Sequence, residues 1–137
     1  MEPLMIMENG STPTVLLNKD KSKFEISGNS LPEDVAGFYA PVYDWIMEYV
    51  KQPNPTTEFH VKIVYFNSSS SKAILDILTM LEEIASKSSK VEVHWYYLEM
   101  DEDMLSTGKE FEYLLTIPFV FIPFQQDNVR LMEKNDF

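Results

Sequence analysis

Hydrophobic and polar positions recur along the chain with two periods, one typical of strands and the other typical of helices. Apolar residues that alternate with polar ones, or that form short continuous runs, predict five strands, at residues 14–18, 23–27, 59–67, 91–97 and 117–124. Apolar residues spaced three and four apart predict three helices, over residues 32–50, 72–85 and 101–115. The polar connection at 19–22 favours an antiparallel hairpin between the first two strands.

Proline and glycine modify two of the predicted helices. Pro41 lacks a backbone donor and its ring clashes with the preceding turn, which costs about 3 kcal/mol in a helix interior, so we expect a kink there or two abutting helices. The sequence at 52–55, Gln-Pro-Asn-Pro, ends this helix because residues before proline avoid helical backbone angles. Gly108 is expected to interrupt the weaker third helix.

The order of the predicted elements indicates an α/β fold. A hairpin followed by alternating helices and strands implies right-handed crossovers and a mixed, mainly parallel five-stranded sheet. In the third and fourth strands, His60, Lys62, Glu92 and His94 alternate with apolar residues, whereas a parallel sheet covered on both faces would be continuously hydrophobic. We therefore expect the helices mainly on one face, with the other face open near the starts of these two strands.

Length and composition narrow the class of protein. The 137 residues suit a single domain, residues 1–137, with a core at about 11–124 and a flexible C-terminal tail at 125–137. The chain has no cysteine, which excludes disulfides and thiolate sites and fits a cytoplasmic location. A net charge of −11 argues against nucleic acid or an anionic membrane as a partner. Residues 1–10 contain no basic leader, and no apolar run is long enough to span a membrane.

Few residues suggest catalysis or metal binding. The two histidines, His60 and His94, lie at polar positions of separate strands, which favours solvent-facing side chains over catalysis or a metal site. An acid–base pair built from these histidines with Glu92 is the weakest alternative. The acidic residues of 99–103 favour a solvated loop that opens the next helix over a magnesium site. We therefore predict no enzymatic activity, no cofactor and no metal site.

A run of four serines lies where the third strand gives way to the second helix. Asn67 ends the strand, and Lys72 begins the predicted helix. Helix starts leave backbone N–H groups unpaired, so Ser70 or Ser71 is expected to cap the helix, and plain capping is the simplest function of the run. Ser68 and Ser69 would then be displayed at the carboxyl edge of the sheet, where ligands tend to bind in α/β folds.

These two serines also suit a phosphorylation switch. A phosphoryl group would add a charge of about −1.5 to −2 next to the positive end of the helix dipole, which the fold can tolerate. A partner that buries neutral hydroxyls would instead meet a hydrated dianion, whose unpaired desolvation costs several kcal/mol. Spacing by itself leaves both the capping and the switch interpretations open.

Several short motifs, in this order and spacing, resemble the SiaC family of bacterial regulatory phosphoproteins. They are Ser11-Thr12-Pro13, Gly28-Asn29-Ser30-Leu31-Pro32-Glu33, Asp44-Trp45-Ile46, and Tyr65-Phe66-Asn67-Ser68-Ser69-Ser70 followed by Lys72-Ala73. The similarity covers residues 11–122. It implies a fold like the anti-sigma-factor antagonists, also called STAS-like, and membership of a partner-switching system without enzymatic activity.

The resemblance also implies a phosphorylation site and three classes of partner. In the family, an anti-sigma-type Ser/Thr kinase phosphorylates the hydroxyl after the strand-ending Asn, here Ser68 with Ser69 as the alternative, and a PP2C-type phosphatase removes the phosphate. The unmodified form of the best-known member binds and activates a diguanylate cyclase, which raises cyclic di-GMP and promotes biofilm formation. The implied partner-binding residues are Asn67, Ser68, Ser69, Ser70, Ser71 and Lys72.

Two positions differ from the best-known family member. Ser68 replaces a threonine, which is a mild chemical change, and Ser71 replaces an apolar residue in the first turn of the helix. The extra hydroxyl adds a candidate acceptor. The alternative function is a constitutive protein-interaction module of the same fold, without a phosphate cycle.

Overall fold

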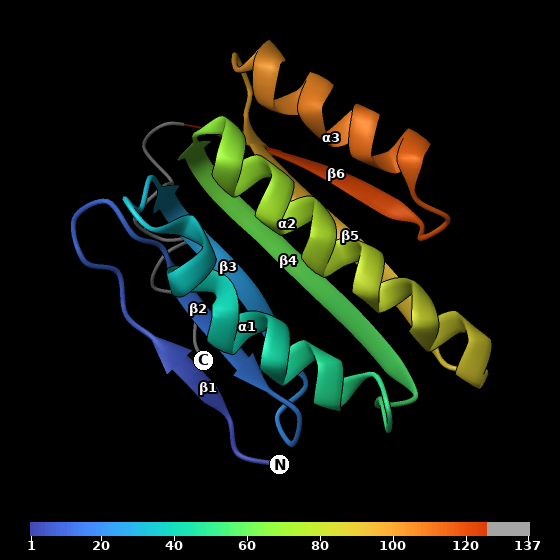
Figure 1. The fold of residues 1–137 in the computed structure, drawn as a ribbon. Helices are drawn as coiled ribbons and strands as arrows, with labels where there is room; N and C mark the ends of the chain where they lie inside the picture. The colour runs from blue at the N-terminus through green and yellow to red at the C-terminus, as the bar shows by residue number, and fades with distance from the viewer. Residues whose placement is uncertain (126–137) are drawn as a thin grey trace.

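The computed structural model describes residues 1–125, which form one mixed sheet and the helices that cover it (Figure 1). The elements are, in chain order, β1 (Leu4–Ile6), β2 (Thr14–Asn18), β3 (Lys23–Ser30), α1 (Val35–Tyr49), β4 (Thr56–Phe66), α2 (Ser68–Met80), the 3₁₀ helix η1 (Leu81–Lys87), β5 (Lys90–Leu98), α3 (Glu102–Leu114) and β6 (Phe119–Phe124). The predicted flexible tail lies outside the described residues, apart from Gln125.

The strands follow one another across the sheet in chain order, β1 to β6. The pairs β1–β2 and β2–β3 are antiparallel, and the later pairs β3–β4, β4–β5 and β5–β6 are parallel. The predicted hairpin and the mainly parallel sheet are therefore confirmed. The predicted number of strands was wrong, because residues 1–125 form six. The strand β1 has three residues, too few to show a period of two, and it forms by pairing Leu4 with Leu17 and Ile6 with Val15 at the edge.

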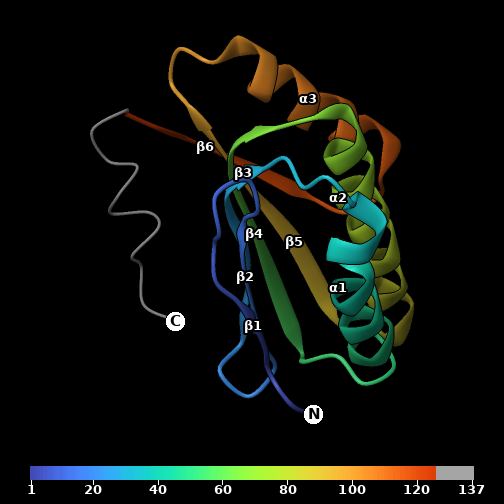
Figure 2. The ribbon, with the colours of Figure 1, turned by 60° about the vertical axis from the view of Figure 1, so that its left-hand side comes forward.

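The helices α1, α2 and α3 lie on the same face of the sheet, as Figure 2 shows with the sheet seen nearly edge-on. The buried residues between helices and sheet form one core, to which every strand from β2 to β5 contributes. Phe24, Phe59 and Trp95 are among its largest fully buried side chains. The prediction of helices on one face is confirmed because the apolar phases of β4 and β5 point toward them.

The helix α1 is continuous through Pro41, so of the two predicted alternatives, a kink or two abutting helices, the second was wrong. The proline is exposed, while Tyr39, Val42 and Ile46 on the opposite side are fully buried. Burial of this apolar face offsets the lost backbone hydrogen bond, since each large side chain contributes about 1.5–3 kcal/mol when it leaves water.

The helix α3 is also continuous, and Gly108 does not interrupt it. A β-carbon at this position would lie 2.6 Å from Nε1 of Trp95 and 2.8 Å from the ring of Phe121. The missing side chain thus lets α3 lie directly on the sheet, and Trp95 Nε1 donates a hydrogen bond to the carbonyl oxygen of Met104. Close packing, rather than a break, explains the glycine.

The face of the sheet without helices is open only in part. Near the starts of β4 and β5, the side chains of Glu58 and Glu92 are exposed by 53% and 42%. Farther along β4, Lys62 is buried and lies 2.9 Å from Glu25 of β3. Within residues 1–125, none of the helices is long and apolar enough to cross a membrane.

Candidate functional site

The helix α2 begins directly after β4, and Asn67 caps it. The side-chain Oδ1 of Asn67 accepts a hydrogen bond of 2.9 Å from the backbone N–H of Ser70, and its backbone is extended. The prediction that Ser70 or Ser71 would be the cap was therefore wrong. Both serines lie inside the first turn, because the helix starts at Ser68 rather than at Lys72, and an Asn at the strand end satisfies the free N–H as well as a serine does.

Ser70 points into the protein and anchors the first turn of α2. The side chain is fully buried, and its Oγ accepts a hydrogen bond of 2.9 Å from Ser30 of β3. The Ser30 hydroxyl also forms a hydrogen bond of 2.7 Å with the hydroxyl of Tyr39 in α1. Because Ser30 donates its own proton to Ser70, Tyr39 is the donor of this second bond. Burial raises the pKa of Tyr39 to about 12, although the Ser30 hydrogen bond opposes this shift. Ser70 therefore joins α2 to β3 and α1 and is not available at the surface.

The other predicted site residues face solvent to different degrees. Ser68 and Ser69 are exposed, and Ser71 is half-buried. Lys72 is exposed, and its Nζ lies 3.3 Å from Oδ2 of Asp76 one turn later. The sequence-based prediction that Ser68 and Ser69 are displayed at the strand-to-helix junction is confirmed.

Two exposed apolar side chains lie at the same end of the sheet as these serines, and sequence reasoning did not include them among the site residues. Tyr65, at the end of β4, is 57% exposed, and Leu31, just after β3, is 36% exposed. The backbone N–H of Asn67 donates to the carbonyl oxygen of Ser30, which holds the two strand ends together. We call the surface formed by Leu31, Tyr65, Ser68, Ser69 and Lys72 the serine corner.

A backbone irregularity shapes this edge of the sheet. Gly28 adopts a φ of 98°, and the register between β3 and β4 shifts between Gly28 and Asn29. Glycine is favoured here because the left-handed region is strained for other residues. Gly28 pairs with Ile63 and Asn29 with Tyr65, so Val64 of β4 has no partner in β3 and Phe66 falls beside Ser30. Ser30 lies in the same strand phase as Ile26, on the face where it meets Tyr39 and Ser70.

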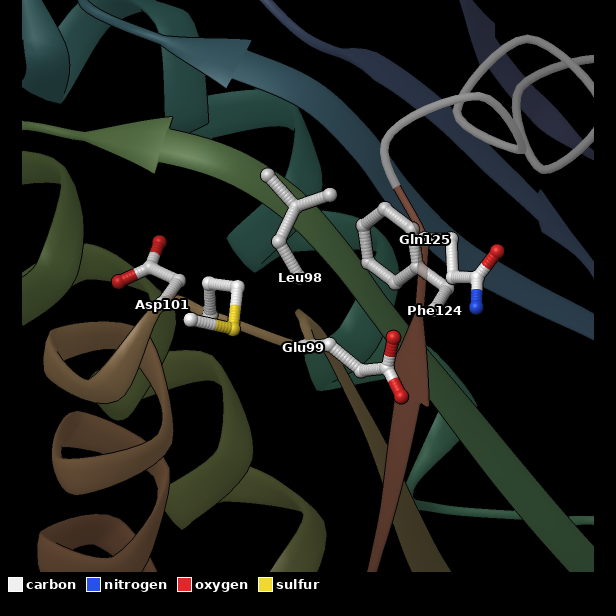
Figure 3. A pocket seen from close by; sticks show the side chains of 6 residues that line it. Leu98, Glu99, Asp101, Phe124 and Gln125 are labelled. Carbon is white, nitrogen blue, oxygen red and sulfur yellow. The ribbon is translucent and has the colours of Figure 1, made fainter.

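A hollow lies at the carboxyl ends of β5 and β6, along the same edge of the sheet as the serine corner (Figure 3). It is lined by Leu98, Glu99, Met100, Asp101, Phe124 and Gln125. Asp101 is the cap of α3, since its Oδ1 accepts a hydrogen bond of 3.0 Å from the backbone N–H of Met104. This arrangement agrees with the interpretation of the acidic segment as a loop that opens the helix.

The two histidines, predicted to face solvent separately, lie side by side on the helix-free face. His60 pairs with His94 in the parallel register of β4 and β5, and their ring centroids are 4.7 Å apart. The pKa of His60 is lowered to about 4 by burial first, then by His94 and by the charges of Lys62 and Lys23. The sequence indicated their shared strand phase, but only the register shows that they meet.

Comparisons with known proteins find a matching family and similar structures. The model of the SiaC family of regulatory phosphoproteins matches residues 6–124. An uncharacterized protein of Pseudomonas aeruginosa strain UCBPP-PA14 is 29% identical over 119 residues, which are 87% of this chain and 94% of that protein. The solved structure of SiaC of Pseudomonas aeruginosa has a TM-score of 0.81 and 27% identity over 90% of this chain and all of that one.

A further structure shows such a protein with a partner. It is the diguanylate cyclase SiaD in complex with its activator SiaC from Pseudomonas aeruginosa, and it matches with a TM-score of 0.82 and 27% identity, over 88% of this chain and 99% of that chain. The family match covers most of the chain, and the similar structures share its sheet and helices. The chain described here therefore belongs to the SiaC family of regulatory phosphoproteins.

Proposed function

We propose that this protein is a non-enzymatic regulator that binds and activates a diguanylate cyclase while Ser68 carries no phosphate. An anti-sigma-type Ser/Thr kinase adds the phosphate, and a PP2C-type phosphatase removes it. The observation that carries the proposal is the exposed hydroxyl of Ser68 as the first residue of α2.

The four serines differ in their access to a kinase. Ser70 is fully buried in the hydrogen-bonded chain with Ser30 and Tyr39, so a kinase would have to unfold the first turn of α2 to reach it. Ser71 is half-buried. Ser68 and Ser69 are exposed, and Ser68 is the closer to the end of the helix, where the dipole favours an added negative charge.

The charges around Ser68 let the folded protein accept a phosphate. The helix end is equivalent to about half a positive charge. Lys72 lies one helical turn from Ser68, and its partner Asp76 holds it in an exposed pair that contributes about 0.3–0.5 kcal/mol. A phosphate on Ser68 can therefore pair with Lys72 in place of Asp76 at little cost to the free energy of folding. Modification then changes the surface and leaves the fold intact.

The same modification would act strongly on a bound partner. Tyr65 and Leu31 present apolar surface at the same end of the sheet as the serines, and such side chains gain free energy only when a partner removes them from water. A dianion within that contact would have to lose its hydration without an opposing charge, at a cost of several kcal/mol. Phosphorylation is therefore expected to release the partner.

The class of partner is supported by a relative. SiaC of Pseudomonas aeruginosa is the activator of the diguanylate cyclase SiaD in the complex described above. At 27% identity, this chain is expected to act on a cyclase of the same class from its own organism.

The first experiment locates the phosphate. The protein is incubated with its cognate kinase and ATP, and the modified residue is mapped by mass spectrometry. We expect one phosphate on Ser68, its loss in Ser68→Ala, and normal modification of Ser69→Ala. Phosphate that remains at wild-type level in Ser68→Ala would contradict the assignment.

The second experiment measures activation, as cyclic di-GMP formed from GTP by the cyclase. Ser68→Ala should activate like the wild type, and Ser68→Asp should lower activation at least tenfold. Ser106→Asp, which adds the same charge at an exposed position of α3, is the matched control and should have no effect. If Ser68→Asp activates as well as the wild type, the protein is a constitutive interaction module instead.

A further inference from the structure

The helix-free face of the sheet carries the same three-residue pattern on two adjacent strands. Glu58-Phe59-His60 in β4 and Glu92-Val93-His94 in β5 both have a carboxylate and an imidazole two positions apart. Residues two apart point to the same face of a strand. The register pairs Glu58 with Glu92 and His60 with His94, so two imidazole and two carboxylate side chains are neighbours on this face. We call these four residues the square.

The donor atoms of this square lie close together. Oε2 of Glu58 is 3.9 Å from Nε2 of His60 and 4.0 Å from Nε2 of His94. Oε1 of Glu92 is 2.7 Å from Nε2 of His94. One donor atom from each of Glu58, His60 and His94 lies within 4.8 Å of the other two.

We propose that Glu58, His60, Glu92 and His94 bind one divalent transition-metal ion, with Zn²⁺ as the reference ion. Tetrahedral Zn²⁺ has bonds of about 2.0–2.2 Å to imidazole nitrogen and carboxylate oxygen, which places the ligand atoms roughly 3.4 Å apart. To reach this spacing, the Glu58 oxygen must approach both imidazoles, and Oε1 of Glu92, now 2.7 Å from Nε2 of His94, must move away from it. Both carboxylates are half in solvent, which gives them room to move and leaves an entry path for the ion.

A neighbouring side chain orients His60 for this role. The hydroxyl of Tyr96 in β5 lies 3.1 Å from Nδ1 of His60. When Nδ1–H donates to this hydroxyl, the free lone pair is on Nε2, which is the nitrogen that faces Glu58. Metal-bound histidines commonly use their second nitrogen in this way.

The chemistry of the donors selects the class of ion. Two imidazoles suit Zn²⁺, Ni²⁺ and Cu²⁺, whereas Mg²⁺ and Ca²⁺ prefer oxygen ligands. The two carboxylates balance the two positive charges of the ion. The nearby ammonium of Lys62 is already paired with the carboxylate of Glu25 at 2.9 Å. The site is separate from the serine corner, because His60 lies six residues before the end of β4, a distance of about 20 Å along an extended strand.

The test uses the full chain without a polyhistidine tag, freed of metal with EDTA. Titration calorimetry with ZnCl₂ should show one Zn²⁺ per chain. His60→Ala/His94→Ala and Glu58→Gln/Glu92→Gln should each weaken binding at least tenfold. Glu83→Gln/Glu110→Gln removes two exposed carboxylates elsewhere and is the matched control, expected to bind as the wild type does.

A second measurement on the wild type requires no variant to fold. Addition of Zn²⁺ should shift the ¹⁵N resonances of both imidazole Nε2 atoms and leave side chains outside this site unchanged. Absence of stoichiometric Zn²⁺ binding, unshifted imidazoles, or equal binding by the histidine double variant would each overturn the proposal. Ser68→Asp should not alter Zn²⁺ affinity, so this outcome is independent of the proposed function.

Discussion

Identical residue types in this protein have different roles because their neighbours differ. Ser68 and Ser70 are two positions apart, yet Ser68 is exposed while Ser70 is fully buried against Ser30. The two histidines resemble isolated surface residues along the chain, but each is a neighbour of the other in the sheet. The chemistry of a residue in this protein is therefore set by the side chains that the fold places beside it.

At the residue scale, Tyr39 should make stability depend on alkaline pH. Burial raises its pKa from 10.0 to about 12, so the unfolded chain loses the proton first. Its stabilising contribution is complete below pH 10 and is lost as the pH rises toward 12, by up to about 3 kcal/mol. Urea unfolding across this range should show a steeper fall for the wild type than for Tyr39→Phe.

The control for this prediction is Tyr113→Phe, since Tyr113 is 89% exposed. That variant should follow the wild type at every pH. Parallel pH profiles for the wild type and Tyr39→Phe would show that the buried hydroxyl has no such effect.

The helices show how local signals and packing combine at the scale of elements. Pro41 and Gly108 would each weaken an isolated helix, but α1 and α3 are continuous because their buried faces pack on the sheet. The start of α2, by contrast, is set locally by the cap at Asn67, whose Oδ1 accepts from the N–H of Ser70.

The cap predicts a measurable loss of stability at this scale. Asn67→Ala should lower the free energy of unfolding by about 0.5–2 kcal/mol, because the N–H of Ser70 loses its acceptor. Ser71→Ala, at a position first expected to cap, should change stability by less than about 0.5 kcal/mol. Chemical denaturation of both variants decides the matter, and a larger loss in Ser71→Ala would refute the assignment of the cap.

The whole molecule is a sheet with one apolar face under the helices and one face that carries charged groups. On the helix-free face, Lys62 and Glu25 form an ion pair of 2.9 Å between β4 and β3, with side chains only 4% and 13% exposed. The ammonium also lies 5.1 Å from the centre of the Tyr96 ring. Paired charges thus replace the apolar contacts that a second layer of helices would supply.

Removal of one partner should leave a buried charge without compensation. Lys62→Met is expected to lower the free energy of unfolding by about 3–5 kcal/mol. The double variant Lys62→Met/Glu25→Leu should recover most of this loss, because it leaves no charge to pair. Thermal and urea unfolding of the two variants would test this, and equal stability of single and double variants would argue against a coupled pair.

The sequence by itself determined the alternation of elements, the hairpin, and the placement of the helices on one face. These properties are local, because the period of apolar residues in segments such as 59–63 and 74–84 decides which side of an element is buried. The exposure of Ser68 and Ser69 was predictable from their place between a strand and a helix, and the family resemblance singled out Ser68.

Only the tertiary structure decided which side chains meet across elements. Strand β1 exists because Leu4 and Ile6 pair with β2, and Ser70 is buried because Ser30 and Tyr39 converge on it. The four-residue square of Glu58, His60, Glu92 and His94 depends on the register of β4 against β5, since a shift of one residue would turn one pair to the opposite face. Register and long-range packing are set by the whole core, and no short segment of the chain contains that information.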